Sequence, residues 1–469
     1  MLLEGLEISE IFYSQIHQEN RYDSEYYQKA YVANEKELRK KPFFQIGEQF
    51  YVTDGEHGSV IEQEFGIKYL TAENIKNGYV DISNVRYVSN EVDRKNARAR
   101  VSVEDVLISI KGTLGAVAVA EEWLLPANMN RDVAILKPLL NKELSKVTAL
   151  FLMSKYGLKQ SSRGGSGGVQ QMITLERLRK FIAPTFSKNF SLALNDLFQK
   201  TKQLRVQSQA SYSQVETLLL ETLGLADFSP CTEKVNIKSF KDSFVATGRL
   251  DAEHYQPKYE QIEEKIKAYS NGFATLGEIS PNPTNGVEIR EYCETGTPYL
   301  RIGDINQLEI NEKSLAYVNQ NAAEALMSKV KLKEGDVLMS RSGSLGVLCV
   351  VEKQWVHSLI SSHLIILRIE DAAINSYFLA LFLSSIAGKL QIVKNSNGGV
   401  QPEINHSALK SILIPKLDME TQTQIATLVQ ESFALKAESG RLLDVAKRAV
   451  EIAIEIDEQA AMAYLERQI

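Results

Sequence analysis

The sequence predicts a mixed α/β (α+β) fold in which two similar globular domains are separated by two long antiparallel coiled-coil helices, with a pseudo-two-fold internal repeat. Three observations lead to this prediction: an internal repeat that relates the two halves of the chain, a heptad period of apolar residues after each copy, and glycine-rich turns between short apolar runs. The 469 residues are too many for one ordinary core, and a content of 44% hydrophobic and 24% charged residues is typical of globular proteins.

The internal repeat keeps both the order and the spacing of its short motifs. The segment DSEYYQ at 23–28 corresponds to DAEHYQ at 251–256, an offset of 228. The DVL at 105–107 recurs at 336–338, the GTLG at 112–115 recurs as GSLG at 343–346, and the GGVQ at 167–170 recurs at 398–401, each with an offset of 231. Such a series indicates a duplication, and a period this long predicts a pair of domains rather than a solenoid.

A heptad pattern follows each copy of the repeat. One position of each heptad is apolar and its companion is mostly Ser, Thr or Ala, so two such helices could approach closely. We predict that the two helices pack on each other in antiparallel fashion, because a whole domain lies between them; the alternative is that each packs only on its own domain. The leucines predicted to form the seam between the helices are Leu197, Leu204, Leu218, Leu428, Leu435 and Leu442.

These patterns predict six segments. They are an N-terminal helical segment (1–40), a first globular domain (41–186), a central helix (187–230), a connector (231–270), a second globular domain (271–416) and a C-terminal helix (417–469). Inside the globular domains we expect strands at 101–110, 117–120, 336–339 and 347–351, and helices at 144–158 and 377–391.

Charge and cysteine content narrow the class of protein. The net charge of −6 argues mildly against a free-standing nucleic-acid binder, but residues 155–180 hold six cations and one acid, and binding follows the local field. No apolar run is long enough to cross a membrane, and the N-terminus has no positively charged start of a secretory signal. Three widely spaced cysteines favour free thiols in a reducing cytoplasm over disulfides or zinc.

Two segments in each copy are candidates for contact with nucleic acid. The turns at 109–115 and 340–346 place a cation and small hydroxyls beside glycines, as phosphate contacts require, although both could be simple hairpin turns. The loops at 161–171 and 394–401 are rich in Gly, Ser, Asn and Gln, and amide side chains can bond an adenine edge. Aligned by eye, Arg341 takes the place of Lys111 in the second copy, and Asn395 and Asn397 take the places of Gly164 and Ser166.

The candidate DNA-contacting residues come from these segments and from nearby polar turns. His57 lies in a polar turn, where a lone histidine is usually only solvated, and His363 lies in an apolar strand, where a hydrogen-bonded core histidine is the simpler interpretation. The full candidate set is His57, Lys111, Thr113, Arg131, Arg163, Ser166, Gln170, Arg301, Arg341, Ser342, Ser344, Asn395, Asn397 and Gln401.

No motif for catalysis is present. The chain has no HExxH, paired CxxC, GxSxG or GxxxxGK[ST] pattern, and Asn282-Pro283-Thr284 falls short of an adenine methyltransferase motif. We therefore expect no catalytic residue, metal or cofactor on this chain.

The duplicated plan, the DVL strand before a G-[ST]-L-G turn, the GGVQ loop and the heptad helices resemble the specificity subunit of type I restriction-modification systems. The resemblance implies two target recognition domains that read the two parts of a split site in double-stranded DNA, with the helices setting the gap between them. It also implies two methyltransferase subunits that bring S-adenosylmethionine, and restriction subunits that bring ATP and Mg²⁺.

Three other interpretations remain open. The chain could be the specificity chain of another, type II-like methylation system, a coiled-coil scaffold that binds only protein, or an enzyme with a site that is diffuse in sequence. Salt-dependent DNA binding would distinguish a specificity chain from a scaffold that binds only protein. Activity of the isolated chain would reveal an enzyme.

Overall fold

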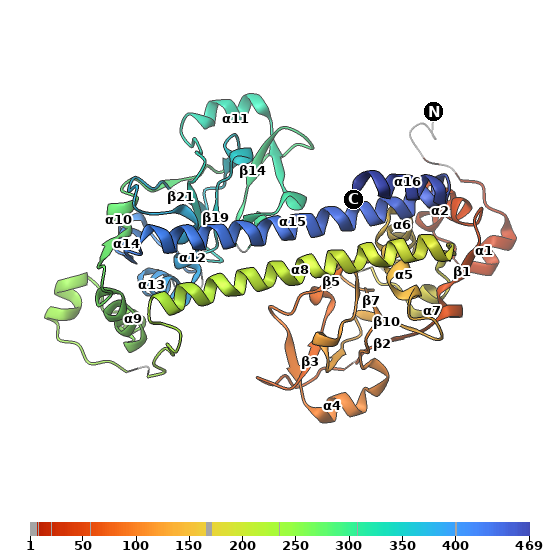
Figure 1. Ribbon diagram of the computed structural model, residues 1–469, viewed down its shortest axis with the longest axis horizontal. Coiled ribbons are helices and arrows are strands. Elements are labelled where there is room, and N and C mark those ends of the chain that lie inside the picture. Colours follow the sequence, from red (N-terminus) through yellow and green to blue (C-terminus); the bar gives the residue numbers. More distant parts are fainter. Residues whose placement is uncertain are drawn as a thin grey trace. The chain divides into compact units, whose positions relative to one another are not determined.

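The computed structural model describes residues 7, 9–19, 21–56, 58–165, 171–233, 235–306, 308–398 and 401–469 (Figure 1). The chain forms two compact units, one of residues 1–206 and 436–469 and the other of residues 207–435. Each unit therefore combines one copy of the repeat with part of each long helix. The six segment boundaries given by the sequence stay predictions.

The first unit is built around an antiparallel four-stranded sheet in the order β2-β10-β7-β8. A second sheet, β6-β3-β9, contains the parallel pair β3 and β9, and β1 pairs with β11. The strands are β1 (Phe43–Gln45), β2 (Phe50–Asp54), β3 (Ile67–Leu70), β4 (Ile75–Lys76), β5 (Tyr79–Val80), β6 (Arg86–Val88), β7 (Val106–Ser109), β8 (Val117–Val119), β9 (Ala127–Met129), β10 (Val133–Pro138) and β11 (Ile182–Pro184). The shorter helices are α1 (Tyr13–Glu19), α2 (Lys29–Leu38), α3 (Ile46–Gln49), α4 (Asn90–Lys95), α5 (Leu144–Met153), α6 (Lys155–Gly164), α7 (Leu175–Arg179) and α16 (Glu458–Gln468).

The second unit repeats this plan. Its four-stranded sheet has the order β13-β21-β18-β19, and its three-stranded sheet, β17-β14-β20, again contains one parallel pair. The strands are β12 (Phe273–Thr275), β13 (Thr284–Asn285), β14 (Thr297–Leu300), β15 (Ile305–Asn306), β16 (Glu309–Ile310), β17 (Ala316–Val318), β18 (Val337–Ser340), β19 (Leu348–Val350), β20 (Leu359–Ile360), β21 (Leu364–Leu367) and β22 (Leu413–Pro415). The shorter helices are α9 (Pro257–Lys267), α10 (Leu276–Ile279), α11 (Gln320–Met327), α12 (Ser376–Ser384), α13 (Ile386–Asn395) and α14 (His406–Lys410).

The correspondence of the two sheet orders confirms the mixed α/β fold and the internal repeat. It also gives the segment 231–270 a structural counterpart, because α9 follows the DAEHYQ motif of the second copy just as α2 follows the DSEYYQ motif of the first. The strands predicted at 117–120, 336–339 and 347–351 are present within about one residue. The strand predicted at 101–110 is shorter, because β7 begins only at Val106.

The two helices predicted at 144–158 and 377–391 are each broken in two. Ser154 and Ser385 end one helix and cap the next, since each side chain accepts a hydrogen bond from the backbone of a glycine three residues later. A Cβ atom on Gly157 would lie 2.5 Å from the carbonyl oxygen of Leu152, and one on Gly388 would lie 2.5 Å from that of Phe382. The apolar periodicity did not reveal these breaks, because both halves of each pair face the same core.

Within the described ranges, no single helix combines the length and apolar composition needed to cross a membrane. Helices α12 and α13 meet that test only as a pair, which is bent by 70°.

The long helices are α8 (Lys188–Thr222) and α15 (Met419–Glu455), which pack against each other inside each unit (Figure 1). In the first unit, Ser439 Oγ donates a hydrogen bond of 2.7 Å to the carbonyl of Thr201. In the second, Ser432 Oγ donates one of 2.8 Å to the carbonyl of Ser208. Going from Ser432 to Ser439 along α15, the bonded residue on α8 moves back by seven positions, from Ser208 to Thr201. This is the register of an antiparallel pair, as predicted.

Side chains at the predicted seam differ in burial. Leu197 and Leu442 are buried, at 3% and 0% exposure, and Leu204, Leu218 and Leu428 are partly buried against the two cores. Leu435 is also partly buried.

The second helix ends earlier than its heptads suggest. Ile456 is 61% exposed and follows the last residue of α15, because Asp457 accepts a hydrogen bond from the backbone of Ala460 and begins α16.

The contact between α8 and α15 leaves no room for a larger side chain at Ser208, which is 5% exposed and lies with its Oγ 3.2 Å from that of Ser432. We expect Ser208→Leu to lower the free energy of unfolding by about 1–3 kcal/mol through overpacking. Ser213→Leu, on an exposed face of the same helix, should have little effect. Chemical unfolding followed by circular dichroism measures both variants, and equal midpoints would contradict the close approach.

Candidate nucleic-acid interface

The turn between β7 and β8 projects a compact loop from the first unit. Gly112 and Gly115 adopt φ values of +78° and +79°, which only glycine takes up readily. The loop is closed by hydrogen bonds from Leu114 to the carbonyl of Gly112 and from Gly115 to that of Ser109. Gly112 and Thr113 are exposed at its end.

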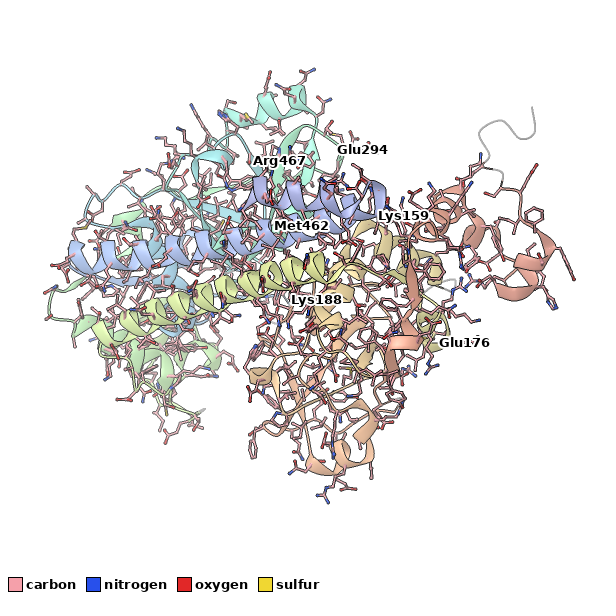
Figure 2. All side chains as sticks on the ribbon, turned by 45° about the vertical axis from the view of Figure 1, so that its right-hand side comes forward. Lys159, Glu176, Lys188, Glu294, Met462 and Arg467 are labelled. Carbon is pink, nitrogen blue, oxygen red and sulfur yellow. The ribbon has the colours of Figure 1, made fainter. Side chains whose placement is uncertain are left out.

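The glycine-rich loop of the first unit begins beside this turn and returns to it. It joins α6 to α7, the helices that carry Lys159 and Glu176 (Figure 2). At its start, a Cβ atom on Gly165 would lie 3.1 Å from a side-chain methyl of Leu114. At its end, Met172 pairs with Lys111, and the Ile173 amide donates to the carbonyl of Ile110 at 2.9 Å. The two segments predicted to contact nucleic acid therefore lie side by side, and residues 109–115 and 171–173 are called the first tip.

The second unit builds the same arrangement. Glu403 pairs on one side with Ser342 and on the other with Asn397, so both residues 397 and 403 lie beside the turn at 340–346. Ile404 donates to the carbonyl of Arg341 at 3.0 Å, as Ile173 does to Ile110. Residues 340–346, 397–398 and 401–404 are called the second tip.

The backbone pairing corrects one alignment between the two copies. Lys111 and Ser342 occupy equivalent positions, because each immediately precedes the first glycine of its turn and forms the equivalent bridge. Arg341 is therefore the counterpart of Ile110, not of Lys111. The prediction from sequence was wrong by one residue, because it paired the two cations, Arg341 and Lys111, and not the residues that precede Gly112 and Gly343.

Each tip contains one cation, and that cation is paired. In the first tip, Lys111 Nζ lies 3.6 Å from Asp132 Oδ1. In the second, the Arg341 guanidinium forms an ion pair with Glu403. Next to it, Ser342 Oγ and His363 Nδ1 lie 2.7 Å apart. His363 is exposed and precedes β21, so the expectation of a core histidine is wrong, although the ring is hydrogen-bonded.

A second histidine at this surface was not singled out from the sequence. His406 Nε2 lies 2.8 Å from Asn285 Oδ1. Burial lowers the pKa of His406, and the positive charges of Arg341 and Lys410 lower it further. The repeat gave no signal for it, since Leu175 stands at the equivalent position of the first copy.

Other candidate residues differ in accessibility. Ser344, Asn397 and Gln401 are exposed at the second tip, as Thr113 is at the first, and Arg131 is exposed beside Asp132. His57, Ser166 and Gln170 lie outside the described residues.

Two candidates have roles inside the second unit. Arg301 forms a reciprocal cap with Asp304 and donates to the carbonyl of Ser314 at 2.6 Å. Asn395 donates to the carbonyl of Gln391.

Arg163 is also held inside the protein. Its guanidinium lies 4.1 Å from the centre of the Tyr26 ring, donates to the carbonyl of Tyr26, and forms an ion pair with Glu35 at 2.6 Å. Although burial alone would raise the pKa of Glu35, hydrogen bonds from Arg163 and Arg39 outweigh that effect and lower it. The second unit repeats this contact with Lys394 and Glu263, at 2.5 Å. The recurrence favours a structural role, which is to fix the preceding helical segment to the globular copy.

The described residues contain no group of three or more His, Cys, Asp or Glu side chains able to hold a metal ion. The side chains and backbone of the two tips offer hydrogen bonding and charge: exposed hydroxyls, amides and backbone at glycines, with one cation in each tip.

Comparison with known proteins finds a similarity in the second copy of the repeat. Residues 273–440 match the model of the family described as the type I restriction modification DNA specificity domain. A curated relative is the type I restriction enzyme EcoBI specificity subunit of Escherichia coli, which is 23% identical over 193 residues. That alignment covers 40% of the present chain and 37% of the relative, so the chain matches little more than a third of its length.

Solved structures of specificity subunits are also similar to this chain. The S subunit of a type I restriction-modification system from M. genitalium is 14% identical, with 90% of this chain and 95% of that chain covered and a TM-score of 0.41. The HsdS subunit of Thermoanaerobacter tengcongensis is 13% identical, with 88% and 96% covered and a TM-score of 0.28.

The internal contacts of Arg163 lead to a test that separates structure from binding. Arg163→Ala leaves Glu35 without one of its two guanidinium partners, and we expect a loss of about 2 kcal/mol of stability in the first unit. Arg131→Ala, an exposed control, should leave stability unchanged. Thermal unfolding and limited proteolysis of residues 1–40 measure the effect. If Arg163→Ala instead keeps its stability and loses affinity for DNA, Arg163 belongs to the interface after all.

Proposed function

We propose that this chain is a type I specificity subunit, which reads a two-part sequence in double-stranded DNA and directs methyltransferase and restriction subunits to it in the cytoplasm. The observation that supports this most directly is the presence of two tips with one backbone plan and different side chains. A purely structural duplication has no need to change the charged and polar groups at its most exposed turns. Two readers of two different half-sites do have that need, because base edges are distinguished by the pattern of donors and acceptors.

In this proposal, the partner subunits carry the catalytic activities. Two methyltransferase subunits would supply S-adenosylmethionine, and restriction subunits would supply ATP and Mg²⁺, while this chain selects the site. The paired helices α8 and α15 would set the number of unspecified base pairs between the half-sites. Each helix belongs in part to each unit, so a change in their length changes the separation of the readers.

Methylome sequencing tests the proposal. Cells that carry this chain with its neighbouring methyltransferase are compared with cells in which the chain is deleted. We expect a split motif whose methylation disappears on deletion, because the methyltransferase alone would lack a reader. Unchanged methylation in a system shown to be expressed would instead favour a scaffold that binds only protein.

The spacing role predicts a graded change in the recognised site. Inserting one heptad in α8 after Val206 and a matching heptad in α15 after Leu435 adds about 10 Å to each helix. At about 3.4 Å per base pair, the unspecified gap should lengthen by about three base pairs while both half-sites keep their sequence. A matched variant replaces seven exposed residues of the same helices without insertion. If the methylated motif of the insertion variant keeps the original gap, the helices do not set the spacing.

A further inference from the structure

The cation of each tip is neutralised in the free protein by a carboxylate on a neighbouring segment. Lys111 lies in the turn after β7, and its partner Asp132 lies just before β10. Arg341 lies in the turn after β18, and its partner Glu403 lies in the segment that pairs with Ser342 and Asn397. The carboxylates therefore come from segments that frame the turn, not from the turn itself.

The two ion pairs do not occupy equivalent positions. Where the second tip has Arg341 and Glu403, the first has Ile110 and Met172, which are 3% and 39% exposed. Where the first tip has Lys111 and Asp132, the second has Ser342 and His363. An ion pair needed for the fold would recur at the same place, as the pair of Arg163 and Glu35 recurs in Lys394 and Glu263. Its appearance at different places in the two tips indicates a role in recognition.

The pairing at the second tip leaves part of the cation unsatisfied. Among the residues that the structure describes, Arg341 Nε is shielded from solvent and has no hydrogen-bond partner. The Glu403 side chain is 49% exposed, whereas that of Arg341 is 24% exposed. A half-exposed carboxylate beside a partly satisfied guanidinium can be displaced by another anion with better geometry, and a phosphate is such an anion.

We propose that Asp132 and Glu403 limit the affinity of the two tips for DNA by holding the tip cations in ion pairs. This inference rests on the proposed function. Any DNA complex that uses Lys111 or Arg341 must first break its ion pair, and it brings a phosphate close to the released carboxylate. Both effects oppose binding to every sequence. Only a matching half-site offers base contacts that offset them, so random DNA is released while a matching site is still bound.

The test measures the affinity of the purified full chain for two duplexes by fluorescence anisotropy. One duplex carries the split motif found by methylome sequencing, and the other has a scrambled sequence of the same composition. The variants are Glu403→Gln and Asp132→Asn, which remove charge without removing bulk. The control is Glu438→Gln, which changes the net charge equally at the exposed pair of Glu438 and Arg441 on α15.

Glu403→Gln and Asp132→Asn should each bind the scrambled duplex about three- to tenfold more tightly than the parent, with a slope of log affinity against log salt that is steeper by about one. Their affinity for the motif should rise by a similar factor, because the same ion pair must be broken there. The control should match the parent on both, and thermal unfolding should show that all variants fold.

Two results would overturn the inference while leaving the proposed function intact. In the first, the variants bind the scrambled duplex no more tightly than the Glu438→Gln control does. In the second, they lose affinity for the motif alone, which would show that the carboxylate accepts a hydrogen bond from a base. If the parent chain binds neither duplex, the proposed function fails and the inference fails with it.

Discussion

The close approach of α8 and α15 is the constraint on which the rest of each unit depends. A side-chain hydroxyl donates to the backbone of the opposite helix in both units, from Ser439 to Thr201 and from Ser432 to Ser208. Such a bond forms only when the backbones are near each other, so these positions must carry short side chains. The seam is therefore determined by side-chain size as much as by apolarity, and the partial burial of Leu435 is compatible with a stable pair.

The globular copies attach to these helices through different chemistry at equivalent positions. In the first unit, Lys202 Nζ of α8 lies 3.6 Å from Glu121 Oε1, and burial lowers the pKa of Lys202. The counterpart of Lys202 is Phe433, which packs against Tyr377 with ring centres 6.5 Å apart. The counterpart of Glu121 is Glu352, which has no lysine at the position equivalent to Lys202. Burial raises the pKa of Glu352, and nearby acidic side chains raise it further. The duplication thus preserved the backbone while the attachments diverged, as the tips did.

The sequence predicted the features that depend on periodicity and order. Glycines with positive φ recur at fixed places in both turns, so the repeat could be found without a structure, and heptads revealed the helix pair. The sequence could not show which cations are neutralised, because that depends on residues distant along the chain: Glu35 lies 128 positions from Arg163, and Glu403 lies 62 from Arg341. An alignment anchored on glycines would have exposed the one-residue error at Arg341.

The charge balance explains why neutralised cations suit the proposed reader of DNA. With a net charge of −6, the chain as a whole repels DNA at long range. Under the proposed function, the attraction of this chain for DNA must therefore come from local groups. Strongly exposed cations would add the same free energy for every sequence and would carry no information. A cation that must first leave a carboxylate adds little on random DNA, so recognition depends on neutral donors and acceptors. The exposed hydroxyls, amides and glycine backbone of the tips are groups of that kind.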